Sequence, residues 1–283
     1  MSLHAASALV STEWLADHIT APDLRIVDAT WDMPFKQRNL RAEYAAAHIP
    51  GAVYADIDDI ADPASPLPHA VPDATLFASR MRKLGIGDGN RVVVYDSNNY
   101  CASARMWWLL RLFGHEDVAV LDGGLSKWQA EGRPLSDTPP SPRERHFTTR
   151  ENTLLLRDLE QMRSNVARRR EQVLDARSAG RFNGTEPEPW PGLRSGRIPG
   201  SRNLPFVDLI ATETATLKPR PALQALFDDA GVDLDQPLVT SCGSGVTACV
   251  LALAAYELGH RDVAVYDGSW TEWAARSDTP IAK

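Results

Sequence analysis

The segment GHEDVAVLDGGLSKW (114–128) returns near the end of the chain as GHRDVAVYDGSWTEW (259–273). Two further pairs precede these segments, in the same order and at similar spacing: RIVDAT (25–30) with QVLDAR (172–177), and AHIPGAVYADI (47–57) with GRIPGSRNLPF (196–206). Repeats that recur in the same order predict one domain fold used twice. The length of 283 residues is also ordinary for two domains.

Short apolar runs alternate with longer helical patterns in both copies. The runs are rich in β-branched residues and are typical of buried strands: LRIVDAT, RVVVYD and VAVLD in the first copy, and QVLDA, PLVTS and VAVYD in the second. The longer stretches include 102–114 and 245–260, and Gly259 is a plausible C-cap of the second. We therefore predict an α/β protein of two tandem domains, each a parallel sheet of about five strands flanked by helices.

A proline-rich segment separates the two copies. Residues 133–147 read RPLSDTPPSPRERHF, and proline at this density stiffens a chain and blocks regular strand pairing. We predict an N-terminal domain over residues 1–140, a linker over 141–150 and a C-terminal domain over 151–283.

Composition excludes several classes of partner. The formal net charge of −7 argues against nucleic acid, and no apolar run approaches the ~18 residues that a membrane-spanning helix needs. The opening stretch, residues 1–14, lacks the basic and apolar regions of a secretory signal. Three widely spaced cysteines do not form a disulfide framework, so we expect a reducing, cytoplasmic setting.

The stretch SCGSGVTAC (241–249) carries the strongest chemical signal. Cys242 follows a predicted strand and precedes a predicted helix, which is where open α/β sheets place their ligands. Gly243 and Gly245 allow the loop through Val246 and Thr247 to turn its amides inward as an anion-binding nest. A thiolate is favoured over a thiol in such a nest. The competing interpretation is a small buried cysteine, which we expect for Cys101 and Cys249.

A thiolate in an anion nest suits attack on phosphorus or on sulfur. Phosphoryl transfer needs an arginine to clamp the phosphoryl oxygens, and residues 243–248 contain no basic residue. A persulfide, whose terminal sulfur needs only amide donors, fits the loop better. No His/Cys cluster has the spacing of metal ligands, so we expect neither metal nor organic cofactor.

The loop CGSGVTA, the segment YDGSWTEW and the paired IPG blocks together give the chain a specific likeness. It resembles the tandem-domain sulfurtransferases of the rhodanese superfamily over nearly its whole length, and its loop is similar to that of the 3-mercaptopyruvate sulfurtransferases. The resemblance implies transfer of sulfur from 3-mercaptopyruvate through a Cys242 persulfide, with release of pyruvate. The acceptor would be a thiol such as thioredoxin, or cyanide. Thiosulfate as donor is the nearest alternative, and a non-catalytic sulfur-carrier module is another.

The resemblance also assigns roles to residues of the second copy. Arg181 matches the arginine that binds the substrate carboxylate, and Ser244 is placed to donate its hydroxyl to the substrate ketone or the leaving enolate. Trp190 stands where relatives commonly have a second substrate arginine. Either Arg194 or Arg197 reaches in instead, or the site depends on Arg181 beside a wall formed by Trp190.

The first copy is predicted to be catalytically inactive. Counting back from the shared Gly-His pair sets Cys242 opposite Ser97, and the loop glycines are absent there. His48 matches a histidine linked to proton relay in relatives, but the aspartate expected to assist it is Asn39. A packing or helix-capping role for His48 is equally consistent with the sequence.

Overall fold

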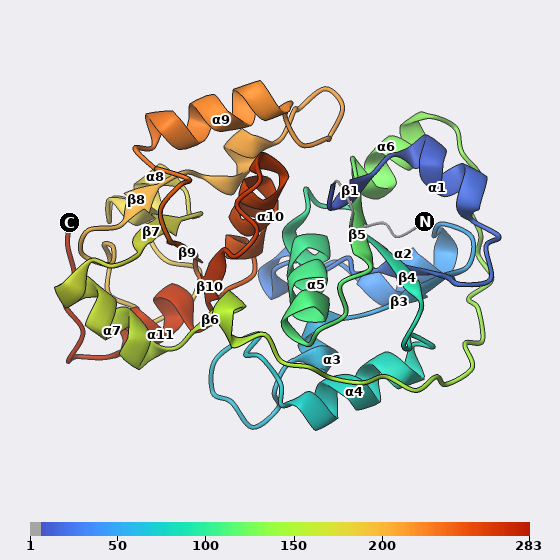
Figure 1. The fold of residues 1–283 in the computed structure, drawn as a ribbon, viewed down its shortest axis with the longest axis horizontal. Helices are drawn as coiled ribbons and strands as arrows, with labels where there is room; N and C mark the ends of the chain where they lie inside the picture. Colours follow the sequence, from blue (N-terminus) through green and yellow to red (C-terminus); the bar gives the residue numbers. More distant parts are fainter. Residues whose placement is uncertain (1–6) are drawn as a thin grey trace. The chain divides into compact units, whose positions relative to one another are not determined.

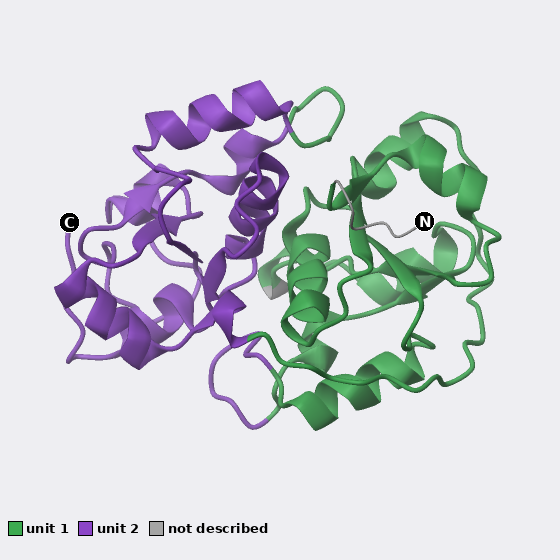
Figure 2. Ribbon diagram, in the orientation of Figure 1, with its two compact units in different colours: residues 1–63, 72–152, 211–217 green, residues 64–71, 153–210, 218–283 purple. Residues whose placement is uncertain are grey.

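The structure is a computed structural model that describes residues 7–283; residues 1–6, which open the stretch used against a secretory signal, lie outside it. The chain forms two compact units, coloured separately in Figure 2. Unit 1 comprises residues up to Pro63 together with Pro72–Asn152 and Ala211–Leu217. Unit 2 comprises Ala64–Val71, Thr153–Ile210 and Lys218–Lys283. Each unit therefore contains a short segment from the other half of the sequence.

Unit 1 is built on a five-stranded parallel sheet in the order β1-β5-β4-β2-β3. Its strands are β1 (Leu9–Val10), β2 (Leu24–Asp28), β3 (Ala52–Tyr54), β4 (Arg91–Tyr95) and β5 (Val118–Leu121). Its helices are α1 (Thr12–His18), η2 (Pro34–Lys36), α2 (Leu40–Ala46), α3 (Ile57–Ile60), α4 (Ala74–Lys83), α5 (Cys101–Leu112) and α6 (Gly124–Ala130). Helices α1 and α6 pack on one sheet face through Leu15 and Trp128, whereas α5 lies against β4 and β5 (Figure 1).

Unit 2 repeats this arrangement with the sheet order β6-β10-β9-β7-β8, again all parallel. Its strands are β6 (Leu156–Arg157), β7 (Gln172–Asp175), β8 (Arg202–Asn203), β9 (Leu238–Ser241) and β10 (Ala264–Tyr266). Its helices are η3 (Thr153–Leu155), α7 (Leu159–Arg168), α8 (Ala179–Phe182), η4 (Phe206–Leu209), α9 (Arg220–Asp229), α10 (Ala248–Leu258) and α11 (Ser269–Ala275). The α/β prediction of two parallel five-stranded sheets is confirmed.

The sequence explains why these elements form where they do. Strands β5 and β10 are buried on both faces and β4 is buried after its first residue, which is why they read as apolar runs. Strand β9 is equally buried but ends in Thr240 and Ser241. Helix α10 is also buried nearly all round. It ends at Gly259, whose φ of 106° lies in the left-handed region, as the C-cap prediction requires. Helix α7 begins with a capping box between Asp158 and Gln161.

The proline-rich segment runs along unit 1 in an ordered conformation. The amide of Asp88 donates to the carbonyl of His146 (2.9 Å), and the amide of Arg150 donates to the carbonyl of Phe113 (2.9 Å). A Cβ atom at Gly87 would lie 2.6 Å from the His146 carbonyl oxygen, so only glycine permits this close approach. The segment is therefore fixed to the first unit by backbone contacts.

Within residues 7–283, no helix is long and apolar enough to cross a membrane.

Candidate active site

Cys242 is the first residue of the loop that joins strand β9 to helix α10 in unit 2. Strand β9 ends at Ser241, helix α10 begins at Ala248, and the Cys242 side chain is only 2% exposed. Gly245 adopts a φ of 78°, a left-handed conformation that glycine takes without strain. Ligands bind at this carboxyl edge in open α/β sheets, so the thiol stands at the expected position for chemistry.

The beginning of α11 holds the loop in place. The amides of Trp270 and Thr271 donate to the carbonyls of Cys242 (3.0 Å) and Gly243 (2.8 Å). The Ser269 hydroxyl accepts from the Cys242 amide (3.1 Å) and donates to the Tyr266 carbonyl (2.7 Å). The repeated YDGSW segment therefore serves as the anchor of the cysteine loop.

Cys249 supports the same loop from helix α10. Its side chain is fully buried, and its thiol donates to the Gly245 carbonyl at 3.3 Å. This is a packing role, as expected for Cys249. Cys101 is only partly buried at the start of α5, so the expectation that it is buried is wrong, and none of the three cysteines forms a disulfide.

The first copy has Asp96, not Ser97, at the position of Cys242. The amide of Leu125 donates to the Asp96 carbonyl (2.9 Å) just as Trp270 does to Cys242. Strand register agrees, because the residues that precede them, Tyr95 and Ser241, pair with equivalent aspartates on β2 and β7. The prediction that set Ser97 opposite the cysteine is wrong, because the first copy has one residue more before its Gly-His pair.

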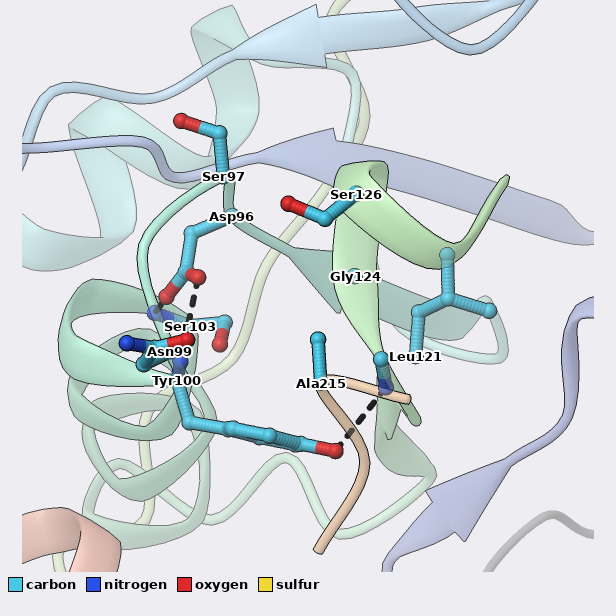
Figure 3. Close-up of a pocket in the computed structure, with 10 residues that line it drawn as sticks. Asp96, Ser97, Asn99, Tyr100, Ser103, Leu121, Gly124, Ser126 and Ala215 are labelled. Carbon is cyan, nitrogen blue, oxygen red and sulfur yellow. Dashed lines mark hydrogen bonds between the residues drawn. The ribbon is translucent and has the colours of Figure 1, made fainter. Parts of the chain in front are cut away.

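The Asp96 carboxylate occupies the loop that it opens (Figure 3). One oxygen accepts from the amides of Asn98 (3.0 Å) and Tyr100 (3.1 Å), and the other from those of Ala102 (3.1 Å) and Ser103 (2.8 Å). The adjoining cavity has a volume of about 10 Å³, enough for one water molecule. This loop thus shows that four amides of such a turn can converge on an anion carried by its first residue.

A histidine that the sequence did not single out lies against Ser244. His69 is 5% exposed and Ser244 is 8% exposed. The Nδ1 atom of His69 lies 3.0 Å from the hydroxyl oxygen of Ser244. The segment 64–71 is part of unit 2, and its Val71 amide donates to the Asp267 carboxylate (2.8 Å). His69 stands in an irregular stretch, PLPHAVP, with no periodicity or motif to mark it; only its isolation between prolines was visible.

His48 is the histidine for which the sequence left packing and proton relay equally open. It belongs to unit 1, is fully buried and stacks on Tyr44, with Nδ1 2.7 Å from the Tyr44 carbonyl oxygen. Its backbone pairs with Ser136. Asn39 caps helix α2 by accepting from the Ala42 amide (3.1 Å). Of the two interpretations left open, these contacts favour packing for His48.

Arg181 is brought to the cysteine loop. A Cβ atom at Gly243 would lie 2.8 Å from Nη2 of Arg181, so the guanidinium lies against the loop and would have to shift for a larger residue at 243. Glu188, whose side chain is 2% exposed, binds Nε (3.1 Å) and Nη2 (2.5 Å) of Arg181 and fixes its orientation.

Glu188 is itself anchored by a second arginine. Its other oxygen accepts from Nη1 of Arg177 (2.7 Å), and Arg177 also pairs with Asp175 (2.7 Å) and stacks 4.4 Å over the Trp270 ring. Burial acts to lower the pKa of Arg177, but the carboxylates of Asp175 and Glu188 outweigh it and raise that pKa above its usual value. Arg177 is therefore a charged, structural arginine that supports the loop carrying Glu188.

The other three predicted residues separate into two groups. Trp190 is partly buried, with its ring edge-on to His69 at a centroid distance of 6.3 Å. Arg194 binds backbone carbonyls of Trp273, Ala274 and Thr279, and Arg197 binds the Lys283 carbonyl and covers the Phe182 ring. Trp190 thus joins the site, while the hydrogen bonds of both arginines go to other parts of unit 2.

Within residues 7–283, no group of three or more His, Cys, Asp and Glu side chains is arranged to hold a metal ion.

Comparison with known proteins shows relatives of the whole chain. The family described as "Rhodanese-like domain" matches residues 11–131 and 158–276. The human 3-mercaptopyruvate sulfurtransferase is 42% identical, with 95% of this chain and 93% of the relative covered. The thiosulfate sulfurtransferase of Cricetulus griseus is 45% identical, with 94% and 91% covered.

A solved structure agrees with these relatives. SseA from Escherichia coli, whose structure is described for the rhodanese fold of 3-mercaptopyruvate sulfotransferases, superposes with a TM-score of 0.86 at 38% identity. The match covers 94% of this chain and 99% of that one.

Proposed function

Because this chain belongs to the rhodanese family and carries two tandem copies of its domain, we propose that it transfers sulfur from 3-mercaptopyruvate through a persulfide on Cys242. The acceptor is a thiol such as thioredoxin, or cyanide in an assay, and pyruvate is released. The observation that carries the choice of donor is the His69–Ser244 hydrogen bond beside the Cys242 loop.

The first step forms the persulfide. The Cys242 thiolate attacks the sulfur of the donor, a new S–S bond forms, and the C–S bond breaks with its electron pair passing to the enolate of pyruvate. The carboxylate of Asp96 supports an anionic sulfur at Cys242, because the corresponding loop of the first copy directs four amides at an anion carried by its first residue. The donor thiol loses its proton and the enolate gains one, so the enolate leaves as pyruvate and the charges balance.

Ser244 and His69 fit the handling of that proton. A hydroxyl held by an imidazole can donate to the enolate oxygen and be reprotonated from the ring. Thiosulfate needs no such group, because its leaving group is sulfite and no enolate has to be protonated. The loop also lacks a basic residue at Gly243 and Ser244 that would favour a dianion.

The second step returns the enzyme to its thiolate. An acceptor thiolate or cyanide attacks the outer sulfur of the persulfide, and the Cys242–sulfur bond breaks with its electrons remaining on Cys242. Such chemistry requires a reducing compartment, and the cytoplasm is our proposal. A relative from Arabidopsis thaliana is named as mitochondrial, which is the alternative compartment.

Thiosulfate is the second candidate donor. It is favoured by the 45% identity to a thiosulfate sulfurtransferase, and it uses the same persulfide. The two donors differ in what they require from Ser244.

The decisive experiment compares kcat/KM for both donors, with cyanide as acceptor, in the wild type, Ser244→Ala and Cys242→Ser. We expect Cys242→Ser to lose all turnover because the nucleophile is gone. We expect Ser244→Ala to reduce kcat/KM for 3-mercaptopyruvate at least about tenfold, through the lost proton donor, and to leave that for thiosulfate nearly unchanged. Turnover by Cys242→Ser contradicts the persulfide, and a wild-type preference for thiosulfate contradicts the donor.

A further inference from the structure

The charged groups beside the Cys242 loop cancel one another. Asp175, Arg177, Glu188 and Arg181 form a continuous chain of ion pairs with two positive and two negative members. The side chains of the first three are at most 2% exposed, and that of Arg181 is 22% exposed. The group therefore has no net positive charge to offer a donor that carries two negative charges.

Arg181 retains hydrogen-bonding capacity for one anionic group. Nε and Nη2 are bound by Glu188, and no acceptor among the described residues binds Nη1. Since Nη1 is the nitrogen left over, it suits a single carboxylate, sulfonyl or similar oxygen of the donor. A second cation is not supplied by Arg194 or Arg197, whose hydrogen bonds go elsewhere.

Trp190 contributes a flat apolar surface to the same site. It follows Glu188 by two residues, and its ring lies at 61° to that of His69, which in turn contacts Ser244. An indole has no charge and no acceptor, so it stabilises a neutral flat group by stacking. Its Nε1–H can donate one hydrogen bond, but it supplies no positive charge to pair with a second negative charge.

We propose that Trp190 is a specificity-determining residue, which selects sulfur donors with one negative charge and a flat apolar face and disfavours dianions. The inference rests on the proposed persulfide function and names the donor class of that same site. Selection has two parts: an attractive surface for the flat group, and the absence of a charge partner for the dianion.

Three donors that break the same kind of bond separate charge from shape. Thiosulfate is a dianion, methanethiosulfonate a monoanion without a ring, and benzenethiosulfonate a monoanion with one. In each case the Cys242 thiolate bonds to the outer sulfur, the S–S bond breaks, and sulfite or a sulfinate leaves with the electron pair. Cyanide then removes the outer sulfur as thiocyanate and restores the thiolate.

The test measures kcat/KM and KM for all three donors in the wild type, Trp190→Ala, Trp190→Phe and Trp190→Arg. We expect the wild type to prefer benzenethiosulfonate over methanethiosulfonate, and Trp190→Ala to reduce this preference about three- to tenfold, as loss of one aromatic contact does. Trp190→Phe should restore most of it. Trp190→Arg should raise kcat/KM for thiosulfate about tenfold by pairing with its second charge.

Leu154→Ala is the control, because Leu154 is a 62% exposed apolar side chain of unit 2 that precedes β6 and so lies at the amino edge of the sheet, opposite the edge that carries Cys242. It should leave all three donors unchanged. Equal losses for the three donors in Trp190→Ala, or no ring preference in the wild type, overturn the inference.

A parallel assay with 3-mercaptopyruvate separates the two proposals. If the wild type turns over 3-mercaptopyruvate but shows no ring preference, the inference fails and the proposed function stands. If the ring preference depends on Trp190 but 3-mercaptopyruvate is inert, the proposed donor fails and the selection by Trp190 stands.

Discussion

Asp96 shows how a single residue sets the state of a whole loop. Its carboxylate accepts four amide hydrogen bonds that any ligand-free loop of this shape would leave to solvent or to an anion. Hydrogen bonds to a charged group are among the stronger ones in proteins. The same residue that removes the nucleophile from the first copy thus also stabilises that copy.

We predict that Asp96→Asn destabilises the protein by roughly 1–3 kcal/mol, because the amide group replaces a charged acceptor and turns a second acceptor into a donor facing backbone N–H groups. Urea unfolding of the full chain measures this change. Asp17→Asn, which removes an exposed carboxylate on α1, is the control and should change the free energy of unfolding by less than about 0.5 kcal/mol. An Asp96→Asn variant as stable as the wild type contradicts the account.

The sequence located the cysteine loop but not all of its surroundings. Cys242, Gly245 and Arg181 were found because they stand in a strand–loop–helix pattern or match a motif. His69 was missed because it lies in an irregular segment far along the chain, and only the fold brings it to Ser244. Asp96 was missed because the alignment was counted back from the Gly-His pairs. The first copy has one more residue between the loop and that pair than the second copy has.

At the scale of elements, periodicity was enough to predict the sheets. Strands β4, β5 and β10 read as strands because burial on both faces favours continuous apolar runs, and β9 because it is short and rich in β-branched residues. The sequence could not show that the proline-rich segment lies along unit 1, because those contacts are backbone hydrogen bonds and close approaches at glycines. Such contacts leave no side-chain pattern.

His115 makes this packed segment sensitive to acid. Its ring stacks on Phe147 at 5.7 Å, and its Nε2 is buried without a hydrogen-bond partner. Burial lowers the pKa of His115, although Asp117 and Asp88 act in the opposite direction. The folded state therefore favours the neutral ring.

The pKa of His115 in the unfolded chain is about 6.5, and the folded-state pKa is lower. We predict that the stability contributed by neutral His115 is fully present above pH 6.5 and is lost as the pH falls below it. The reason is that the unfolded chain takes up a proton at a higher pH than the folded chain does. Free energies of unfolding between pH 7.5 and 5 measure the slope. His115→Gln should flatten part of it, whereas His18→Gln, at the end of α1, serves as the control. An unchanged slope in His115→Gln removes His115 from the acid response.

At the scale of the whole molecule, neither half of the sequence builds its unit alone. Residues 64–71 complete unit 2 with His69, and residues 211–217 complete unit 1. In unit 1 the Leu217 amide donates to the Tyr100 hydroxyl (2.8 Å) and to Asp122 (3.0 Å). The two repeats in the sequence predicted the duplication, but not this exchange of segments.

We predict that a fragment of residues 151–283 loses 3-mercaptopyruvate turnover more than about 100-fold, because it lacks His69 and the Val71 contact to Asp267. Adding residues 1–150 should restore activity. The control is the full chain cut by a protease at a site introduced into 141–150 and assayed without separation, which should remain active. Full activity of the isolated fragment contradicts this account.

The Asp96 carboxylate also determines how each domain responds to metabolites. A ligand that binds only the folded state stabilises it by an amount that grows with the logarithm of its concentration once this exceeds Kd. Asp96 supplies its loop with an anion that is tethered and always present, so the four amides it binds are not available to a donor. On the proposed function the Cys242 loop takes its anion from solution, so we expect added donor to stabilise the folded chain through unit 2. Donor supply would then act on the stability of the protein through one of its two corresponding loops.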